Sequence, residues 1–377
     1  MGMKRGFVLM CVLMVVAWAA RAHVADTTGY QPVYYEPAPE GKLRFFFDDG
    51  YYLADKLCPF KRVERVAVFD FAKQVFDGEF VDFDLAGRAI LRGRYVNGRK
   101  DGEFTAYHPN GEVKWTVSFV QGLPNGVWSF FYPDGKPLLE VEYGPTATMI
   151  RNFWDARGRQ RVTDGNGRYD FEVLADGYNP YGYVRYRRRG RVVNGLPQGA
   201  WIVEYIFDDG EKASAGHEYY EAGRFVRGYE VFSDEEFSDG PRYGLFPTVF
   251  FDRAERMVSK ACSIDEYSGF TQWLEGYVEE WLAHIPPGTT PGRQVEFVIA
   301  VDEAGTAGRI EAVQSLDDEG QARLLLSALE EIAFWFPSYA DGDYIEDKLT
   351  LTAEVYPDPA SGRLRFFNIQ IGRERGQ

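Results

Sequence analysis

The side chains of this sequence that could support chemistry are few and scattered. The four histidines have no metal-ligand spacing with one another or with a cysteine; they are His23, His108, His217 and His284. The sequence also contains no phosphate loop, nucleophile elbow or dinucleotide fingerprint. We therefore predict a protein that is not an enzyme and that holds no metal or other cofactor.

Acidic residues beside glycines are the next candidates. Asp82 and Asp84, ahead of Gly87, have part of the pattern of a calcium loop, but its third acid and closing Glu are missing. A turn is the better interpretation of this segment. Solvated turns are also predicted for Asp48, Asp49, Asp208 and Asp209. Acids near outward aromatic rings would suit glycan binding or hydrolysis, which we keep as a less favoured alternative.

Five arginines crowd seven positions of an otherwise acidic chain: Arg185, Arg187, Arg188, Arg189 and Arg191. The functional hypothesis is an anionic-partner patch that contacts lipopolysaccharide or an acidic receptor loop. The alternative is an exposed hairpin end whose arginines pair with neighbouring acids.

The N-terminus has the three-part layout of a secretory signal. Lys4 and Arg5 precede an apolar stretch from Gly6 to Ala20, and small residues flank Arg21. The stretch is short for a membrane span, although a retained anchor is the alternative to cleavage. Removing residues 1–22 removes three bases and no acid, which takes the net charge from −15 to −18. Such a charge argues against binding nucleic acid or an anionic membrane through the whole surface of the protein.

Two cysteines remain after cleavage, Cys58 and Cys262. In an oxidising compartment they would form a possible disulfide. Two buried free thiols are the other interpretation, because no spacing rule supports a pair so far apart.

The strongest internal signal is a period of 24 residues. Glycines recur at this step, as Gly87, Gly111 and Gly135, and aromatic residues do the same. Alternating apolar residues flank the turn at 109–111, which is typical of a β-hairpin with one apolar face. Because a lone hairpin is unstable in water, the copies should pair side by side into an antiparallel array from about residue 66 to 230.

The pattern from Tyr95-Val96-Asn97-Gly98 to Tyr107-His108-Pro109-Asn110-Gly111 resembles the MORN-like repeats of bacterial YwqK-type proteins. The resemblance covers residues 76–143 well and 150–230 loosely. It implies a β-hairpin array and protein binding.

The C-terminal part predicts a different fold. An acidic connector at 233–236 is followed by Ser263-Ile264-Asp265-Glu266, a capping box, and by an amphipathic helix that should end near Ile285. The helix is expected to pack on the final domain, with a partner-helix groove as the alternative. Strands at 295–301, 309–313, 349–355 and 364–371, with a helix after Asp317 and Asp318, predict a two-layer α+β unit.

Residues 285–355 resemble the TonB C-terminal domain. The shared features are Gly292, Val295, Phe297 and Val298 in the first strand, the Val301-Asp302-x-x-Gly305 turn, Ser315, and Trp335-x-Pro337. The resemblance implies peptide binding by strand addition at a sheet edge. Energy-coupling members also have a retained anchor and a long Pro/Lys-rich spacer, and this sequence departs from both features.

The expected organisation is a signal peptide (1–22), a leader with edge strands (23–65), the repeat array (66–230), a connector with the amphipathic helix (231–285) and the α+β domain (286–377). We predict an exported, non-enzymatic interaction protein of a Gram-negative cell envelope, periplasmic or associated with the outer membrane. Its partner would be an envelope protein or peptide, such as an outer-membrane receptor. An accessory of TonB-type transport is the alternative.

Overall fold

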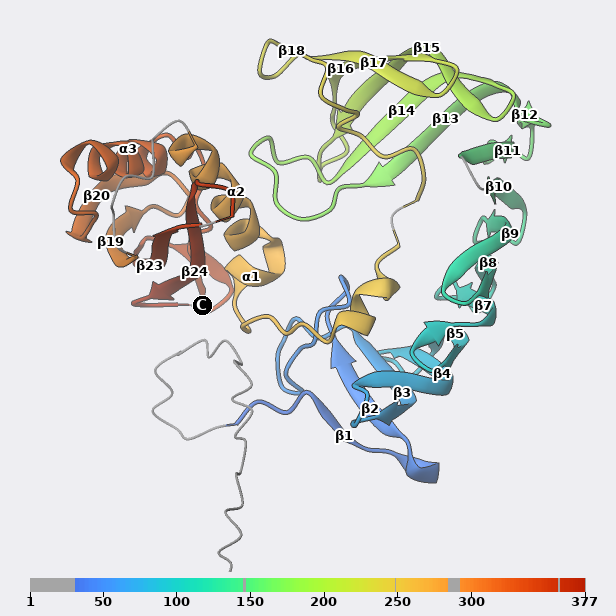
Figure 1. The fold of residues 1–377 in the computed structure, drawn as a ribbon, viewed down its shortest axis with the longest axis horizontal. Helices are drawn as coiled ribbons and strands as arrows, with labels where there is room; N and C mark the ends of the chain where they lie inside the picture. Colours follow the sequence, from blue (N-terminus) through green and yellow to red (C-terminus); the bar gives the residue numbers. More distant parts are fainter. Residues whose placement is uncertain (1–30, 145–146, 248, 284–291, 359, 377) are drawn as a thin grey trace, which may run out of the picture. The chain divides into compact units, whose positions relative to one another are not determined.

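The computed structural model describes residues 31–144, 147–247, 249–283, 292–358 and 360–376 (Figure 1). Residues 32–377 belong to one unit. The predicted signal peptide (1–22), His23, His284 and the predicted helix end at Ile285 lie outside the described residues. Within the described part, no helix is long and apolar enough to cross a membrane.

Most of the unit is an antiparallel meander in which almost every strand pairs with the next along the chain. Its first strands are β1 (Tyr35–Pro37), β2 (Leu43–Phe47), β3 (Val63–Asp70), β4 (Val75–Asp84), β5 (Ala89–Val96), β6 (Arg99–Lys100), β7 (Gly102–Tyr107), β8 (Val113–Val120) and β9 (Leu123–Phe131). It continues through β10 (Pro137–Tyr143), β11 (Thr148–Trp154), β12 (Gln160–Thr163), β13 (Asn166–Leu174), β14 (Arg185–Val193), β15 (Leu196–Ile206), β16 (Lys212–Glu221), β17 (Arg224–Glu230) and β18 (Glu235–Phe237). The sheet therefore extends beyond the predicted range 66–230 at both ends.

The period of 24 residues is present in the turns. Gly87, Gly111 and Gly135 have φ values of 76, 88 and 77°, a region that glycine adopts without steric cost. Each donates its N–H to the carbonyl three residues earlier, on Asp84, His108 and Tyr132, at 2.9 Å. The turn interpretation is thus confirmed at Asp84, but it is wrong for Asp82, which lies inside β4, is fully buried and forms an ion pair with Arg65. His108 is structural as well, because its Nε2 lies 2.9 Å from the carbonyl oxygen of Phe131.

An apolar face of the meander is covered by the segment that follows it. The short 3₁₀ helix η2 (Phe251–Arg256) places the ring of Phe251 5.7 Å from that of Phe104 and 5.6 Å from that of Trp115. The Nζ of Lys100 forms ion pairs with Asp252 at 2.8 Å and Glu255 at 2.9 Å. The chain after the array therefore contributes to the array's own core.

The helical region differs from its prediction. Ser263 accepts a hydrogen bond from the Glu266 N–H at 3.3 Å, so the Ser half of the capping box is confirmed. The predicted single helix is wrong, because α1 (Ile264–Ser268) ends at Gly269, whose φ is 82°. A second helix, α2 (Phe270–Leu282), starts directly after it.

The C-terminal residues form a second, four-stranded antiparallel sheet in the order β20–β19–β23–β24. Its elements are β19 (Arg293–Val301), β20 (Ala307–Gln314), α3 (Glu319–Glu330), β23 (Asp347–Pro357) and β24 (Leu364–Arg373). They include the four predicted strands, and Asp318 is the N-cap of α3, as predicted. The hairpin of β21 (Ser338–Ala340) and β22 (Asp343–Ile345) was not predicted. Helices α2 and α3 and the sheet share one hydrophobic core, which makes two layers.

Candidate functional site

The five predicted arginines do not form one surface patch. On the outward face of β14, Arg187 Nε contacts Asp170 Oδ1 at 2.6 Å, and Arg189 Nη2 contacts Glu204 Oε1 at 2.8 Å. Arg185 pairs with Glu172 at 3.3 Å. These three guanidinium groups are therefore largely neutralised by acids on the neighbouring strands β13 and β15, as in the alternative interpretation.

Arg188 points to the opposite face and is fully buried. Its Nη2 lies 2.5 Å from Glu218 Oε2, and its Nη1 donates to the carbonyl oxygen of Tyr243 at 2.6 Å. The guanidinium also lies 5.3 Å from the centre of the Trp201 ring. Arg188 is thus part of the core, and no external partner can reach it. Its assignment to a contact surface is wrong.

Arg191 differs from the other four arginines because it is exposed and pairs with no carboxylate among the described residues. In the strand register it lies directly opposite Arg168 on β13. Arg168 and its neighbour Arg161 were not predicted as site residues. The two-residue turn at Asp164-Gly165 could have indicated them. Residues 161 and 168 lie at equal distances from its centre, so a hairpin places them opposite each other.

The outer edge of the C-terminal sheet is the second candidate site. β20 is an edge strand, since in the described part of the chain it pairs only with β19. Its side chains are mostly exposed, and Val313 has 60% of its surface accessible. The opposite edge strand, β24, is tied to α2 by ion pairs of Arg365 with Glu275 and Glu279. β20 is therefore the more open edge for another strand.

A small hollow of about 330 Å³ lies beside the buried carboxyl of Asp48. Asp48 is 2% exposed, so its assignment to a solvated turn is wrong, whereas Asp49, Asp208 and Asp209 are exposed as expected. Burial raises the pKa of Asp48 to about 6, and Lys260, 3.9 Å away, and the Tyr52 N–H only partly offset this rise. A single buried acid does not make the acid–base pair that glycan hydrolysis needs.

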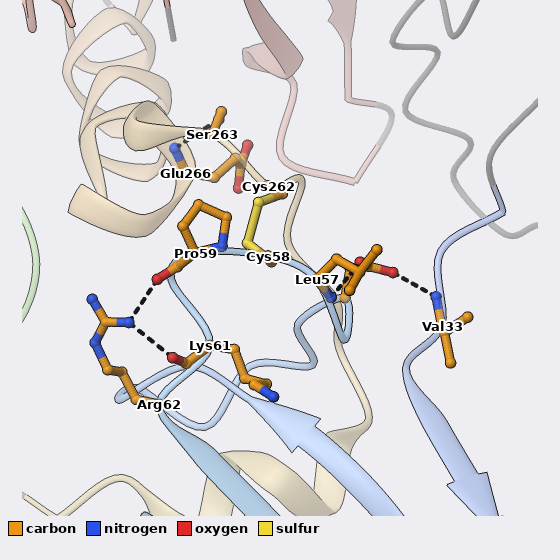
Figure 2. Close-up of a disulfide and its surroundings, with 10 residues drawn as sticks. Val33, Leu57, Cys58, Pro59, Lys61, Arg62, Cys262, Ser263 and Glu266 are labelled. Atoms are coloured by element: carbon orange, nitrogen blue, oxygen red, sulfur yellow. Dashed lines mark hydrogen bonds between the residues drawn. A yellow bond between two sulfur atoms is a disulfide. The ribbon is translucent and has the colours of Figure 1, made fainter. Parts of the chain in front are cut away.

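Cys58 and Cys262 are joined in a disulfide, with their Cα atoms 5.8 Å apart (Figure 2). The bond links the loop between β2 and β3 to the residue before the N-cap Ser263. Close by, the rings of Phe60 and Tyr267 stack with their centres 4.7 Å apart. Loop and helix start are thus held by a covalent bond and an aromatic contact. No cluster of His, Cys, Asp or Glu suited to a metal ion occurs in the part of the chain that the structure describes.

Comparison with known proteins adds little to this geometry. No family model matches the chain, and no curated protein matches it in sequence. Among solved structures, the crystal structure of a GtfA/B complex bound to UDP and GlcNAc has a chain that is 16% identical over 33% of this one, with a TM-score of 0.13. The match spans 25% of that chain's length. A TM-score this low supports no conclusion on fold or activity.

Proposed function

We propose that this chain is an exported, non-enzymatic interaction protein of a bacterial cell envelope. The repeat array serves as a docking surface, and the C-terminal domain binds an extended peptide of a partner protein. The observation that carries the proposal is the open edge of β20 in the C-terminal sheet. An edge strand presents unpaired N–H and C=O groups, to which a peptide can add as a further strand.

Two further features support this proposal. The resemblance of residues 285–355 to the TonB C-terminal domain implies the same mode of binding, with main-chain hydrogen bonds supplying much of the affinity. A disulfide between Cys58 and Cys262 is typical of exported proteins, because cytosolic reductants keep thiols reduced.

The test uses the full chain in its native host, with a photo-crosslinking amino acid at Val313 on β20. The control position is Tyr344 on β22, which has similar exposure (53% against 60%) in the same domain. We expect Val313 to form adducts with a peptide segment of an envelope protein and Tyr344 to form none. Amide hydrogen exchange should then slow across Ala307–Gln314 in the complex. Equal adducts at both positions, or none at Val313, would contradict the peptide-binding role.

A further inference from the structure

Three exposed arginines lie in a row across β12, β13 and β14. Arg168 and Arg191 are directly opposite each other in the register of β13 and β14. Val162 of β12 pairs with Gly167, so the same register brings Arg161 beside Arg168. All three side chains border one shallow surface hollow of about 600 Å³. The row therefore concentrates three positive charges at a place with room for a ligand.

The row of three arginines differs from other positions on the same face of the sheet. Like charges directly opposite each other destabilise a sheet, and the chain has 57 acids against 42 Lys and Arg residues. In the next two outward rows of the same strands, Asp170 lies opposite Arg189 and Glu172 opposite Arg187, and Arg187 forms ion pairs with Asp170 and Glu204. Among the described residues, no carboxylate forms an ion pair with Arg161, Arg168 or Arg191. The repulsion between the three arginines of this row is therefore not compensated by acids, in contrast to the rows around Arg187 and Arg189.

An earlier copy of the repeat shows what has been replaced. Gly93-Arg94-Tyr95-Val96-Asn97-Gly98 corresponds to Gly190-Arg191-Val192-Val193-Asn194-Gly195. Arg94 lies opposite Glu79 on one side and forms an ion pair with Asp101 on the other.

Arg191 occupies the same place in its own copy, but its neighbours are Arg168 and Gln198. Both flanking acids of the earlier copy are therefore absent, one replaced by a base and one by an amide. Arg191 therefore lacks a carboxylate partner within the protein, and a ligand can supply that negative charge.

Gly167 holds the row together. Its φ is 151°, and a Cβ at this position would collide with the carbonyl oxygen of Arg161 on β12. A side chain here would push β12 away from β13 and separate Arg161 from Arg168. The close approach of the two strands therefore depends on this glycine.

The spacing and charge of the row select the ligand. Neighbouring strands are about 4.8 Å apart, so the three backbone positions span about 10 Å. One carboxylate would balance only one guanidinium, whereas a phosphate ester carries about −1.5 to −2 charges and accepts the forked N–H donors of arginine. We propose that Arg161, Arg168 and Arg191 form a binding site for a phosphate-bearing ligand, either a diphosphate or adjacent phosphate esters.

The proposal is independent of peptide binding by β20, because the row lies in the repeat array. The phosphate has two possible sources, a soluble compound or a lipid headgroup. Two arms of the test distinguish them: calorimetric titration of the full chain with inorganic pyrophosphate, and flotation with phosphatidylcholine vesicles that contain or lack phosphatidic acid. Binding in either arm supports the site and names the source, and binding in neither overturns it.

Two triple variants distinguish a specific phosphate site from nonspecific attraction between arginines and phosphate. The triple variant Arg161→Gln, Arg168→Gln, Arg191→Gln should weaken binding at least about tenfold, the effect of losing about 1.4 kcal/mol. A matched control, Arg99→Gln, Arg157→Gln, Arg227→Gln, removes the same charge from exposed arginines that are scattered over the array. It should bind as the wild type does. An equal loss in both variants would overturn the proposal.

Two more measurements do not depend on that comparison. Gln198→Glu restores a carboxylate opposite Arg191, as at Asp101 in the earlier copy, and should also weaken binding. Without ligand, the triple variant should have a higher melting temperature than the wild type, because it relieves like-charge repulsion. A lower melting temperature would contradict the repulsion on which the site is argued.

Discussion

The guanidinium of Arg188 on β14 and the carboxylate of Glu218 on β16 form a fully buried ion pair, although β15 lies between their strands. Glu218 also accepts a hydrogen bond from the hydroxyl of Tyr220 at 2.7 Å. A second buried pair, Arg65 with Asp82, joins β3 and β4 at 2.7 Å near the start of the sheet. Two basic residues of this acidic chain are therefore committed to the interior.

Arg188→Met should destabilise the protein by about 3–5 kcal/mol, because it leaves the carboxylate of Glu218 buried without its cation. The control is Arg189→Met, which removes a partly exposed ion pair and should cost about 1 kcal/mol or less. Urea unfolding of both variants measures the difference. Similar losses for the two would mean that the buried pair contributes no more than a surface pair.

Breaking the disulfide should also destabilise the fold strongly. The bond joins residues 204 positions apart, and closing a loop of that length restricts the unfolded chain by about 5 kcal/mol in the chain-entropy description. We expect Cys58→Ser with Cys262→Ser to lose about 2–5 kcal/mol in chemical unfolding. Reductant should lower the stability of the wild type to that of the double variant and leave the variant unchanged. A wild type that is insensitive to reductant would contradict this assignment.

The repeat was predictable because its signals are local. Turn residues at a constant step, with alternating apolar residues between them, determine each hairpin without reference to distant parts of the chain. The strands of the C-terminal sheet and the cap at Asp318 were predictable for the same reason. The break at Gly269 was missed because the apolar spacing continues through it, and only the backbone angle reveals the end of α1.

The burial and the ion-pair partners of single charged residues were much harder to predict. Arg187, Arg188 and Arg189 are consecutive and of one type, yet Arg188 is buried and its neighbours are not, because alternate residues of a strand face opposite sides. The acid that neutralises Arg188 lies 30 residues away on a strand that is not adjacent. The burial of Asp48 likewise depends on Tyr52 and on Lys260, which is more than 200 positions away.

Asp48 should make stability depend on pH in a direction opposite to that of a salt-bridged acid. Its pKa is about 6 in the folded protein against an ordinary value of 3.8, so the folded state binds more protons between about pH 4 and 6. The contribution of Asp48 to stability is therefore highest below about pH 4 and is lost as the pH rises through about 6.

Asp48→Asn should be more stable than the wild type by up to about 3 kcal/mol at pH 8, with the gain shrinking towards pH 4. Asp49→Asn, which removes the same charge from the exposed neighbour, is the control. Denaturant unfolding across this pH range measures both differences. A gain that does not change with pH would contradict the role given to burial.

At several places in the sheet, an aromatic ring packs directly on the backbone of a glycine. A Cβ on Gly93 would lie 2.7 Å from the ring of Phe104, and Cβ atoms on Gly190 and Gly228 would overlap the rings of Trp201 and Phe237. In each case an aromatic side chain of the neighbouring strand lies over the bare backbone of the glycine. These glycines are selected by close packing and not by a turn.

Gly190→Ala and Gly276→Ala should therefore have opposite effects, although both add one methyl group. At Gly190 the methyl group has no space beside the buried ring of Trp201, and displacing that ring should cost about 1–3 kcal/mol. Gly276 lies on the exposed side of α2 with nothing near its added Cβ, so alanine should stabilise the helix by up to about 1 kcal/mol. Thermal unfolding of the two variants measures the signs. If Gly190→Ala were as stable as the wild type, the Trp201 ring would have to move freely, and the proposed close packing of aromatic rings on glycine backbone would be wrong.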